Sequence, residues 1–280
     1  MSVTLGPHTS PSDQPRSFKN FDQGLFQVHA KPPRKSEAPL IFDIGVNHGE
    51  DSEFYLAKGF RVVGIEANPI LCAKLQERFE NEIASGQYNL LNIGIWSEEK
   101  ELEFYHNLDN DHWSSFDREY GCRNDTKFEI LNIKCTTIDR LLSDFGTPHY
   151  MKIDVEGADR IILKQLQHVS ARPNFISVEE YGFQAIVHLR ELGYRFFYVA
   201  PQNDKSWAVP PNPAREGLYV ERAFTGVDSG LFGAELPGSW MNFEEALRHF
   251  LTHVRAADGS FLTTGEWYDV HARISDPQLD

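Results

Sequence analysis

Short apolar runs alternate with helical stretches along most of the chain. Six such runs predict buried strands, at residues 40–45, 61–67, 89–96, 150–155, 174–179 and 194–199. Apolar residues that recur every three or four positions predict helices between them, at residues 50–58, from Pro69 onward, around 162–166 and at 184–192. This alternation is typical of a Rossmann-like α/β fold, whose mostly parallel sheet carries helices on both faces. Ligands of such sheets bind beyond the carboxyl ends of the strands.

Composition divides the chain into three parts. Residues 1–37 are rich in Ser, Pro, Lys and Gln and predict an N-terminal arm. Residues 38–200 predict the ligand-binding domain, and residues 201–280 predict a C-terminal extension that packs on it. A few apolar residues of the arm are candidates for docking on the core, namely Phe21, Leu25, Phe26 and Val28.

The C-terminal extension begins with a proline-rich connector and then shows a helical pattern. Asn242 and Glu245 form a predicted N-cap pair for a helix over residues 243–254. The segment 265–274 predicts either a late strand or a lid over the ligand. Within the core, two further strands are predicted on either side of a long loop, at residues 101–105 and 128–134.

The charge balance narrows the classes of partner. Asp and Glu outnumber Lys and Arg by 41 to 27, giving a formal net charge of −14, which disfavours a nucleic-acid partner. The three cysteines form no Cys-x-x-Cys pair, so we expect reduced thiols and neither a disulfide framework nor a zinc ribbon. Neither a signal peptide nor a membrane span is predicted, and we expect a cytoplasmic protein without membrane insertion. The oligomeric state stays open.

The most informative stretch is residues 42–69, read as strand, glycine turn, helix, strand and acidic residue. Its glycines are spaced Gly45-x-x-x-Gly49, which is not the G-x-G-x-x-G of dinucleotide sites. Glu66, at the end of the second strand, suits the two hydroxyls of a ribose. Asp43, at the end of the first, suits a cationic ligand. S-adenosylmethionine fits both expectations, whereas the alternative is that these residues only cap helices and shape turns.

Four sequence blocks resemble the FkbM-type methyltransferases, over roughly residues 40–200. They are FDIGVNHGEDSEFYLAKGFRVVGIEANP (42–69), HWSSF (112–116), TTIDRLLSDFGTPHYMKIDVEGADRIILKQL (136–166) and FISVEE (175–180). The resemblance implies a class I methyltransferase fold with a seven-stranded sheet, and methyl transfer from S-adenosylmethionine, usually to oxygen. It implies a cofactor site formed by Asp43, Gly45, Asn47, Gly49 and Glu66. Val46 departs from the pattern, since many relatives have alanine there. Relatives act on sugars, macrolides and other hydroxyl compounds, so the resemblance does not name the acceptor.

An alcohol acceptor needs a general base beside the sulfonium, at the carboxyl edge of the sheet. The predicted catalytic residues are Asp154, His112 and Glu180. For Asp154, the alternatives are an ion pair with Lys152 or a cap on the following helix. Oxygen ligands at the strand ends are compatible with magnesium, but no third ligand is evident. A divalent metal is therefore possible but not expected, and no metal ligand is assigned.

The remaining predicted site residues lie in loops near the strand ends. Trp96, at the end of the third strand, is the predicted adenine contact. Four residues are predicted to bind the acceptor, a small molecule or carbohydrate: Trp113, Ser114, Ser115 and Glu156. Loop packing is the alternative role for Trp113. His48 is expected to be a turn residue, and His249 and His253 to lie on a solvated helix face.

These observations predict an S-adenosylmethionine-dependent O-methyltransferase that acts on a hydroxyl of a small molecule or sugar. The alternative from another class is a non-catalytic protein that binds the cofactor or a glycan on the same fold. A nicotinamide-dependent oxidoreductase is a third candidate. The missing G-x-G-x-x-G and the missing Tyr-x-x-x-Lys pair count against it.

Overall fold

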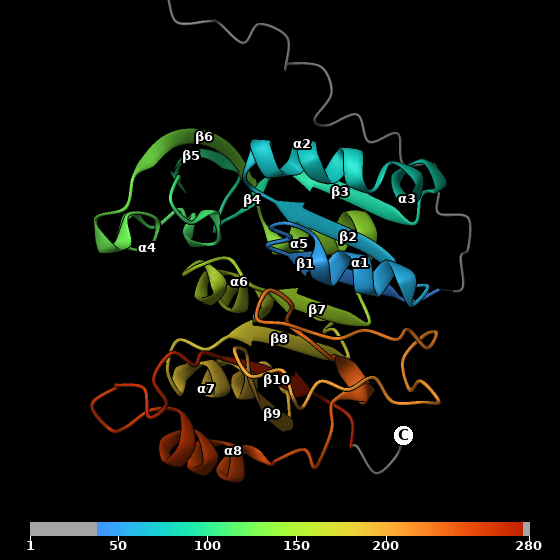
Figure 1. The fold of residues 1–280 in the computed structure, drawn as a ribbon, viewed down its shortest axis with the longest axis vertical. Coiled ribbons are helices and arrows are strands. Elements are labelled where there is room, and N and C mark those ends of the chain that lie inside the picture. Colours follow the sequence, from blue (N-terminus) through green and yellow to red (C-terminus); the bar gives the residue numbers. More distant parts are fainter. Residues whose placement is uncertain (1–37, 277–280) are drawn as a thin grey trace, which may run out of the picture. The chain divides into compact units, whose positions relative to one another are not determined.

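The computed structural model describes residues 38–276 (Figure 1). The predicted N-terminal arm, with Phe21, Leu25, Phe26 and Val28, lies outside the described residues. In the part that is described, no helix has the length and apolar character needed to cross a membrane.

A seven-stranded sheet with the order β3-β2-β1-β7-β8-β10-β9 forms the centre of the fold. Its strands are β1 (Leu40–Ile44), β2 (Arg61–Glu66), β3 (Tyr88–Asn92), β7 (Tyr150–Ile153), β8 (Phe175–Glu179), β9 (Phe196–Pro201) and β10 (Tyr268–Arg273). The strands from β3 to β8 pair in parallel, whereas β10 is antiparallel to both neighbours. The prediction of a mostly parallel seven-stranded sheet is confirmed. Strand order reverses between β1 and β7, the place where ligands bind in such sheets.

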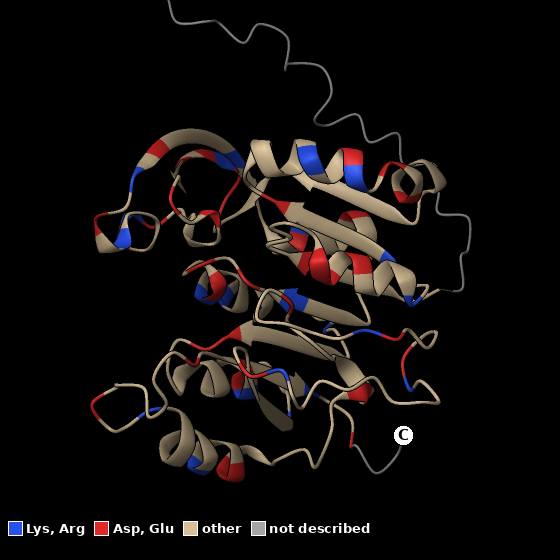
Figure 2. Ribbon diagram, viewed as in Figure 1, with Lys and Arg blue, Asp and Glu red and all other residues tan. Residues whose placement is uncertain are grey.

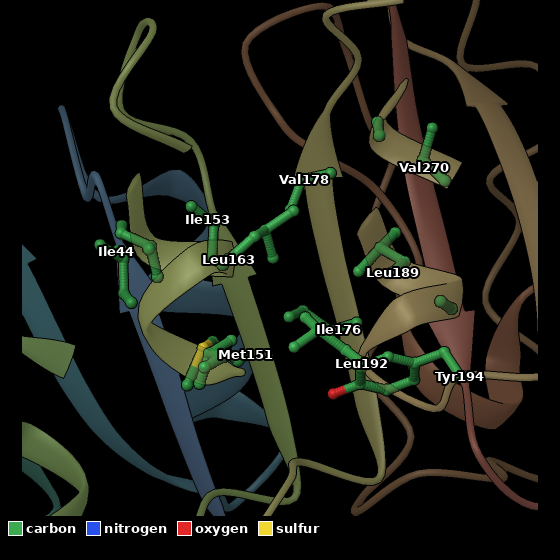
Figure 3. Packing of buried hydrophobic residues seen from close by; sticks show 14 of the residues in the cluster. Ile44, Met151, Ile153, Leu163, Ile176, Val178, Leu189, Leu192, Tyr194 and Val270 are labelled. Atoms are coloured by element: carbon green, nitrogen blue, oxygen red, sulfur yellow. The ribbon is translucent and has the colours of Figure 1, made fainter. Parts of the chain in front are cut away.

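Helices cover both faces of the sheet because successive side chains of each strand point to opposite sides. Ile41 and Tyr150 pack in one apolar cluster, and their neighbours Phe42 and Met151 pack in another. The first face carries α1 (Glu50–Ala57), α2 (Pro69–Arg78) and α3 (Glu80–Ser85). The second carries α5 (Ile138–Phe145), α6 (Asp159–Leu166), α7 (Gln184–Glu191) and α8 (Phe243–His249). Figure 3 shows Leu163 of α6 and Leu189 of α7 beside the strands on this second face.

The C-terminal extension completes the core. Phe224, Leu231 and Phe232 pack against the aromatic rings of Phe54 and Tyr55 in α1, on the face that lacks helices over β8 and β10. Of the two alternatives for residues 265–274, the structure has the strand, since β10 lies between β8 and β9 with every position buried.

The predicted helix over residues 243–254 is divided. The capping box is present, with Glu245 N donating to Asn242 Oδ1 at 3.0 Å and Asn242 N donating to Glu245 Oε2 at 2.9 Å. The α-helix α8 then continues as one π-helical turn, Phe250–Val254. This turn brings the chain to the carboxyl edge of the sheet, where it reaches the cavity described below.

The prediction of one strand over residues 89–96 is wrong. The chain leaves the central sheet after β3, where Asn92 Nδ2 donates to the carbonyls of Glu66 and Ala67. It then forms β4 (Gly94–Ile95) in a second sheet of order β4-β6-β5, with β5 (Lys100–Asn107) and β6 (Phe128–Thr136). Gly94 is required at this bend, because a Cβ there would lie 2.4 Å from the Phe116 ring.

The loop between β5 and β6 carries three short helices. They are a 3-10 helix, Asp111–Trp113, then α4 (Arg118–Gly121) and a second 3-10 helix, Arg123–Asp125. This second sheet and its loop lie beside the carboxyl edge of the central sheet (Figure 1), and residues of the loop line the cavity there.

Candidate active site

The carboxyl ends of β1, β2, β7 and β8 open onto a cavity of about 1030 Å³. Carboxylates gather at this edge, as the red tips of β2 and β8 in Figure 2 illustrate. The cavity wall includes twelve Asp or Glu residues against four Lys or Arg residues. A cavity of this size and charge suits a cationic organic ligand together with a second small molecule.

The glycine turn after β1 forms one wall. Gly45 has a φ of +89°, and a Cβ there would lie 1.8 Å from the carbonyl oxygen of Asp154. No other residue fits at this position, so the turn and the end of β7 are in direct backbone contact. Asn47 also has a positive φ, +53°, and it lines the cavity. Gly49 does not line it; a Cβ there would instead meet Leu75 and Phe79 at 2.7 Å.

Glu66, at the end of β2, lies beside this turn, since β2 is the neighbour of β1. Its Oε2 accepts a hydrogen bond from Asn47 N at 2.8 Å, and its Oε1 accepts one from Asn68 N at 2.7 Å. Burial raises the pKa of Glu66 to about 7, although both backbone hydrogen bonds act in the opposite direction. Each oxygen is therefore held in place and retains a lone pair for a ligand hydroxyl.

Two polar atoms beside Glu66 lack a partner among the described residues. They are Asn47 Oδ1 and Asn68 Nδ2, both buried in residues that line the cavity. Buried polar atoms in folded proteins are nearly always paired, so an unpaired acceptor and donor here fit a ligand with hydroxyl and amino groups. Sequence reasoning missed Asn68, although its place before Pro69 marks it as the cap of α2, which it is.

The wall next to Glu66 is apolar. Leu71, Ile93, Ile95 and Phe116 line it. Trp96 does not; its ring packs against Phe116, and its carbonyl accepts a hydrogen bond from Gln165 Nε2 at 2.6 Å. The apolar wall offers a surface for a flat heteroaromatic ring such as adenine. The bend at Gly94, which turns Ile93 and Ile95 toward the cavity, was not visible in the sequence.

A buried lysine organises the carboxylates below the cavity. Lys152 Nζ lies 3.1 Å from Asp51, 3.2 Å from Asp154 and 3.8 Å from Asp43. Burial acts to lower the pKa of Lys152, but the three carboxylates hold it well above its ordinary value. Asp43 is fully buried within β1, accepts from Ser52 Oγ at 2.6 Å and does not line the cavity. Asp43 therefore supports the site from one layer below.

Asp154 forms an ion pair and also faces the cavity. Its carboxylate forms the expected ion pair with Lys152. Its side chain is also 42% exposed and lines the cavity, next to Gly45. A carboxylate that is held on one side and open on the other can accept a proton from a bound hydroxyl.

Glu179, rather than Glu180, occupies the position on β8 that corresponds to Asp154 at the end of β7. Both glutamates line the cavity. Glu180 accepts from Arg255 Nε at 2.9 Å and from Gly182 N at 2.7 Å, so its charge is already paired. Glu179 has no hydrogen-bond partner among residues 38–276, and burial, followed by the nearby Asp154 charge, raises the pKa of Glu179 well above its ordinary value.

Sequence comparison places the chain in a family. Residues 43–196 match the Methyltransferase FkbM domain, a span of more than half the chain. The chain belongs to the FkbM methyltransferase family. This is the family that the sequence motifs predicted, and the mostly parallel α/β sheet agrees with the predicted fold. Among curated proteins, no match was found.

Several solved methyltransferase structures are similar to this chain. Methyltransferase FkbM from Methylobacillus flagellatus KT is 20% identical, with a TM-score of 0.35, over 52% of this chain and 33% of that one. The chain thus spans about one third of that protein. Precorrin-6y C5,15-methyltransferase from Geobacter metallireducens GS-15 is 11% identical, with a TM-score of 0.37, over 85% and 80% of the two chains. The glycopeptide N-methyltransferase MtfA complexed with S-adenosylmethionine is 10% identical, with a TM-score of 0.33, over 85% and 88%.

In this FkbM methyltransferase, the loop between β5 and β6 covers one end of the cavity. His112, Trp113 and Ser114 line the cavity, whereas Ser115 does not. Ser115 Oγ instead donates to the carbonyl of Glu156 at 2.6 Å and ties this loop to the end of β7.

Trp113 and Glu156, two of the predicted acceptor-binding residues, both contact Arg123. The Arg123 guanidinium lies 4.8 Å from the centre of the Trp113 ring and donates a hydrogen bond to the Glu156 carboxylate. Burial raises the pKa of Glu156 to about 7, against the opposing effect of Arg123. Glu156 lines the cavity, but it also anchors the loop, so loop packing is part of the role of both Trp113 and Glu156.

One group of side chains at the cavity mouth has the composition of a metal site. The ligand atoms of His48, Asp111 and His112 lie within 4.8 Å of one another, and His48 Nε2 is 3.1 Å from Asp111 Oδ2. Two imidazoles and one carboxylate can hold a divalent transition metal. The sequence did not predict this grouping, since Asp111 and His48 lie in different loops that only the fold brings together.

Proposed function

We propose that this FkbM methyltransferase transfers a methyl group from S-adenosylmethionine to a hydroxyl group of a small molecule or sugar. The observation that carries the proposal is Glu66, whose two carboxylate oxygens are each fixed by a backbone N–H at the cavity wall. A carboxylate in this position suits two neighbouring ribose hydroxyls.

The other residues of the proposed cofactor site follow from this anchor. Asn68 Nδ2 would donate to the ribose, and the apolar wall beside Ile93 and Ile95 would hold the adenine. The turn at Gly45 and Asn47 would hold the amino-acid end of the cofactor. Asp43, Gly49 and Trp96 do not line the cavity, and they would support the residues that contact the cofactor. When bound, the cofactor supplies an electrophilic methyl group.

We propose Asp154 as the general base. The acceptor hydroxyl would give its proton to the Asp154 carboxylate while its oxygen forms the bond to the methyl carbon and the methyl–sulfur bond breaks. Lys152 orients the carboxylate through the 3.2 Å ion pair, and Glu180 is engaged by Arg255. His112 remains the second candidate because it lines the same cavity. General-base assistance of this kind contributes about 10²–10⁴ in rate.

The two parts of the chain, before and after residue 200, would have different roles. Residues 38–200 would bind the cofactor, and the extension from residue 201 onward would contribute the acceptor side of the cavity, to which it supplies Leu251 and Trp267. The three cysteines are unpaired, which is compatible with a reducing cytoplasm.

The proposal is tested by titrating the full chain with S-adenosylhomocysteine in a calorimeter, and then by methyl transfer from tritiated S-adenosylmethionine to a panel of hydroxyl compounds. We expect binding by the wild type and a loss of at least about tenfold in Glu66→Ala, since two hydrogen bonds to a charged group are removed. No heat with the wild type would refute the proposal. Binding without transfer to any acceptor would favour the non-catalytic alternative.

A further inference from the structure

We propose that Glu179 and Asp269 form an acidic pair that binds a protonated amine of the methyl acceptor, so that the acceptor is a hydroxylated amine with an apolar flank. This inference rests on the proposed function, because it concerns the acceptor half of the same cavity. It adds a chemical class of substrate that neither the family nor the motifs specify.

The sheet places the two carboxylates side by side. Asp269 on β10 is the direct antiparallel partner of Glu179 on β8. Directly opposed residues point to the same face of a sheet, with their Cβ atoms about 4.5–5.5 Å apart. Two like charges in this arrangement repel each other, so the pair calls for a positive partner.

Asp269 supplies the observation that points to a ligand. It is only 7% exposed, yet it lines the cavity. Within residues 38–276, no donor is within hydrogen-bond or ion-pair distance of the Asp269 carboxylate, and the same holds for Glu179. Neither carboxylate is among the fully enclosed polar atoms that lack a partner, so the oxygens of both open onto the cavity, where a ligand can donate to them. Burial, together with the charge of Asp154, raises the pKa of Asp269 to about 7, which a bound cation would reverse.

The nearby lysines cannot serve as that partner. Lys152 is surrounded by Asp43, Asp51 and Asp154. Lys205 donates to Gln202 Oε1 and, at 3.1 Å, to the carbonyl of Ser229. The charges of both lysines act to lower the pKa of Asp269, but neither forms a contact with it.

The position of the pair separates it from the proposed cofactor site. Neighbouring strands lie about 4.8 Å apart, and the order β2-β1-β7-β8-β10 puts Glu179 about 14 Å and Asp269 about 19 Å from the strand that carries Glu66. A cofactor anchored on Glu66 and the Gly45 turn occupies the ends of β2, β1 and β7. The ends of β8 and β10 then face the acceptor.

The cavity that holds the pair also has exposed apolar residues. Five exposed apolar residues line the cavity, and all of them follow β8 in the chain: Phe183, Val227, Leu251, Phe261 and Trp267. Trp267 lines the same cavity two residues before Asp269 and is exposed, and we expect its indole to contribute a cation–π contact to a bound ammonium group. Together these residues favour an amine on an apolar body. The excess of carboxylates in the same cavity disfavours phosphorylated or acidic acceptors.

The test uses the complex of the full chain with S-adenosylhomocysteine and two matched pairs of probes. The pairs are tyramine with N-acetyltyramine, and glucosamine with N-acetylglucosamine; the members of each pair share their hydroxyls and differ in the charged amine. We expect the amine of at least one pair to bind at least about tenfold more tightly than its acetylated partner, a difference typical of one charge-assisted contact. Calorimetry or ligand-observed NMR measures it.

Three variants show where the preference arises. Glu179→Gln and Asp269→Asn should each remove the preference for the amine while S-adenosylhomocysteine binds as before. Asp258→Asn is the matched control, since Asp258 is a carboxylate of the same cavity but caps only Ser260; it should keep the preference.

Other outcomes overturn the inference. They are equal binding within both pairs, no binding of either amine, or a preference that survives in Glu179→Gln and Asp269→Asn. A wild-type chain that fails to bind S-adenosylhomocysteine would refute the proposed function as well, so the two failures are distinguishable.

Discussion

At the scale of single residues, the clearest constraint is the contact between the glycine turn and the end of β7. Substituting Gly45→Ala would place a Cβ 1.8 Å from the Asp154 carbonyl, at a φ of +89°. Because backbone cannot yield as a side chain can, we expect loss of S-adenosylhomocysteine binding by more than about tenfold and a fall in unfolding free energy above the ~1–2 kcal/mol of left-handed strain alone. Gly86→Ala is the control: its φ is +77°, but nothing lies within 4 Å, so binding should persist. Calorimetry and urea denaturation measure both effects.

Glu66 predicts a pH dependence with a defined sign. Burial raises its pKa from 4.5 to about 7, so the ligand-free fold loses stability as the pH rises through this interval and Glu66 ionises. Ribose hydroxyls favour the ionised form, because it accepts two hydrogen bonds. Affinity for S-adenosylhomocysteine should therefore rise between about pH 6 and pH 8.

The comparison for this prediction is Glu66→Gln. Asp43 opposes and Lys152 favours the ionisation of Glu66, and both remain in the variant. Other carboxyls with raised pKa values, such as Glu156 and Asp269, titrate in both proteins. The difference between the two affinity curves isolates Glu66. A difference that stays constant with pH would contradict the assignment.

At the scale of elements, an ion pair joins the residue that caps the C-terminus of α1 to the C-terminal extension. Lys58 Nζ donates to Glu235 Oε1 and to the carbonyl of Leu218, each at 2.9 Å, and the side chains of the ion pair are 0% exposed. Removing one partner leaves an unpaired buried charge, so Lys58→Met should lower the unfolding free energy by about 3–5 kcal/mol. The double variant Lys58→Met with Glu235→Met should recover part of this loss, as measured by urea denaturation. Equal stability of the single variant and the wild type would contradict this.

At the scale of the whole molecule, β10 links β9 to the rest of the central sheet. β10 is buried at all six positions and pairs with both β8 and β9, so it is an interior strand although it is the last strand of residues 38–276. A chain ending at Gly265 should not fold, because β9 would lose its partner in the sheet, β8 would lose one of its two partners, and the apolar residues Val270 and Ala272 would be missing from the core. A chain that ends at Asp276 keeps β10 and is the control. Circular dichroism and thermal unfolding distinguish the two.

Much of the fold could be predicted because local signals decide it. Apolar runs bounded by Gly and Pro located the strands and helices of the core, and Glu66 could be placed at a strand end from the length of one strand–helix–strand unit. Gly45, Asn47, Glu66 and Asp154 were all chosen from the sequence, and all line the cavity.

What the sequence by itself determined is therefore which residues are buried, which strands follow one another and which family the motifs resemble. Only the tertiary structure decided that Glu179 rather than Glu180 lacks a partner, that Trp96 turns away from the cavity, and that β10 inserts between β8 and β9. The physical reason is that periodicity along a chain reports burial. The partner of a buried charge or of a strand edge comes from a distant segment, such as Arg255 for Glu180, and no local pattern carries that information.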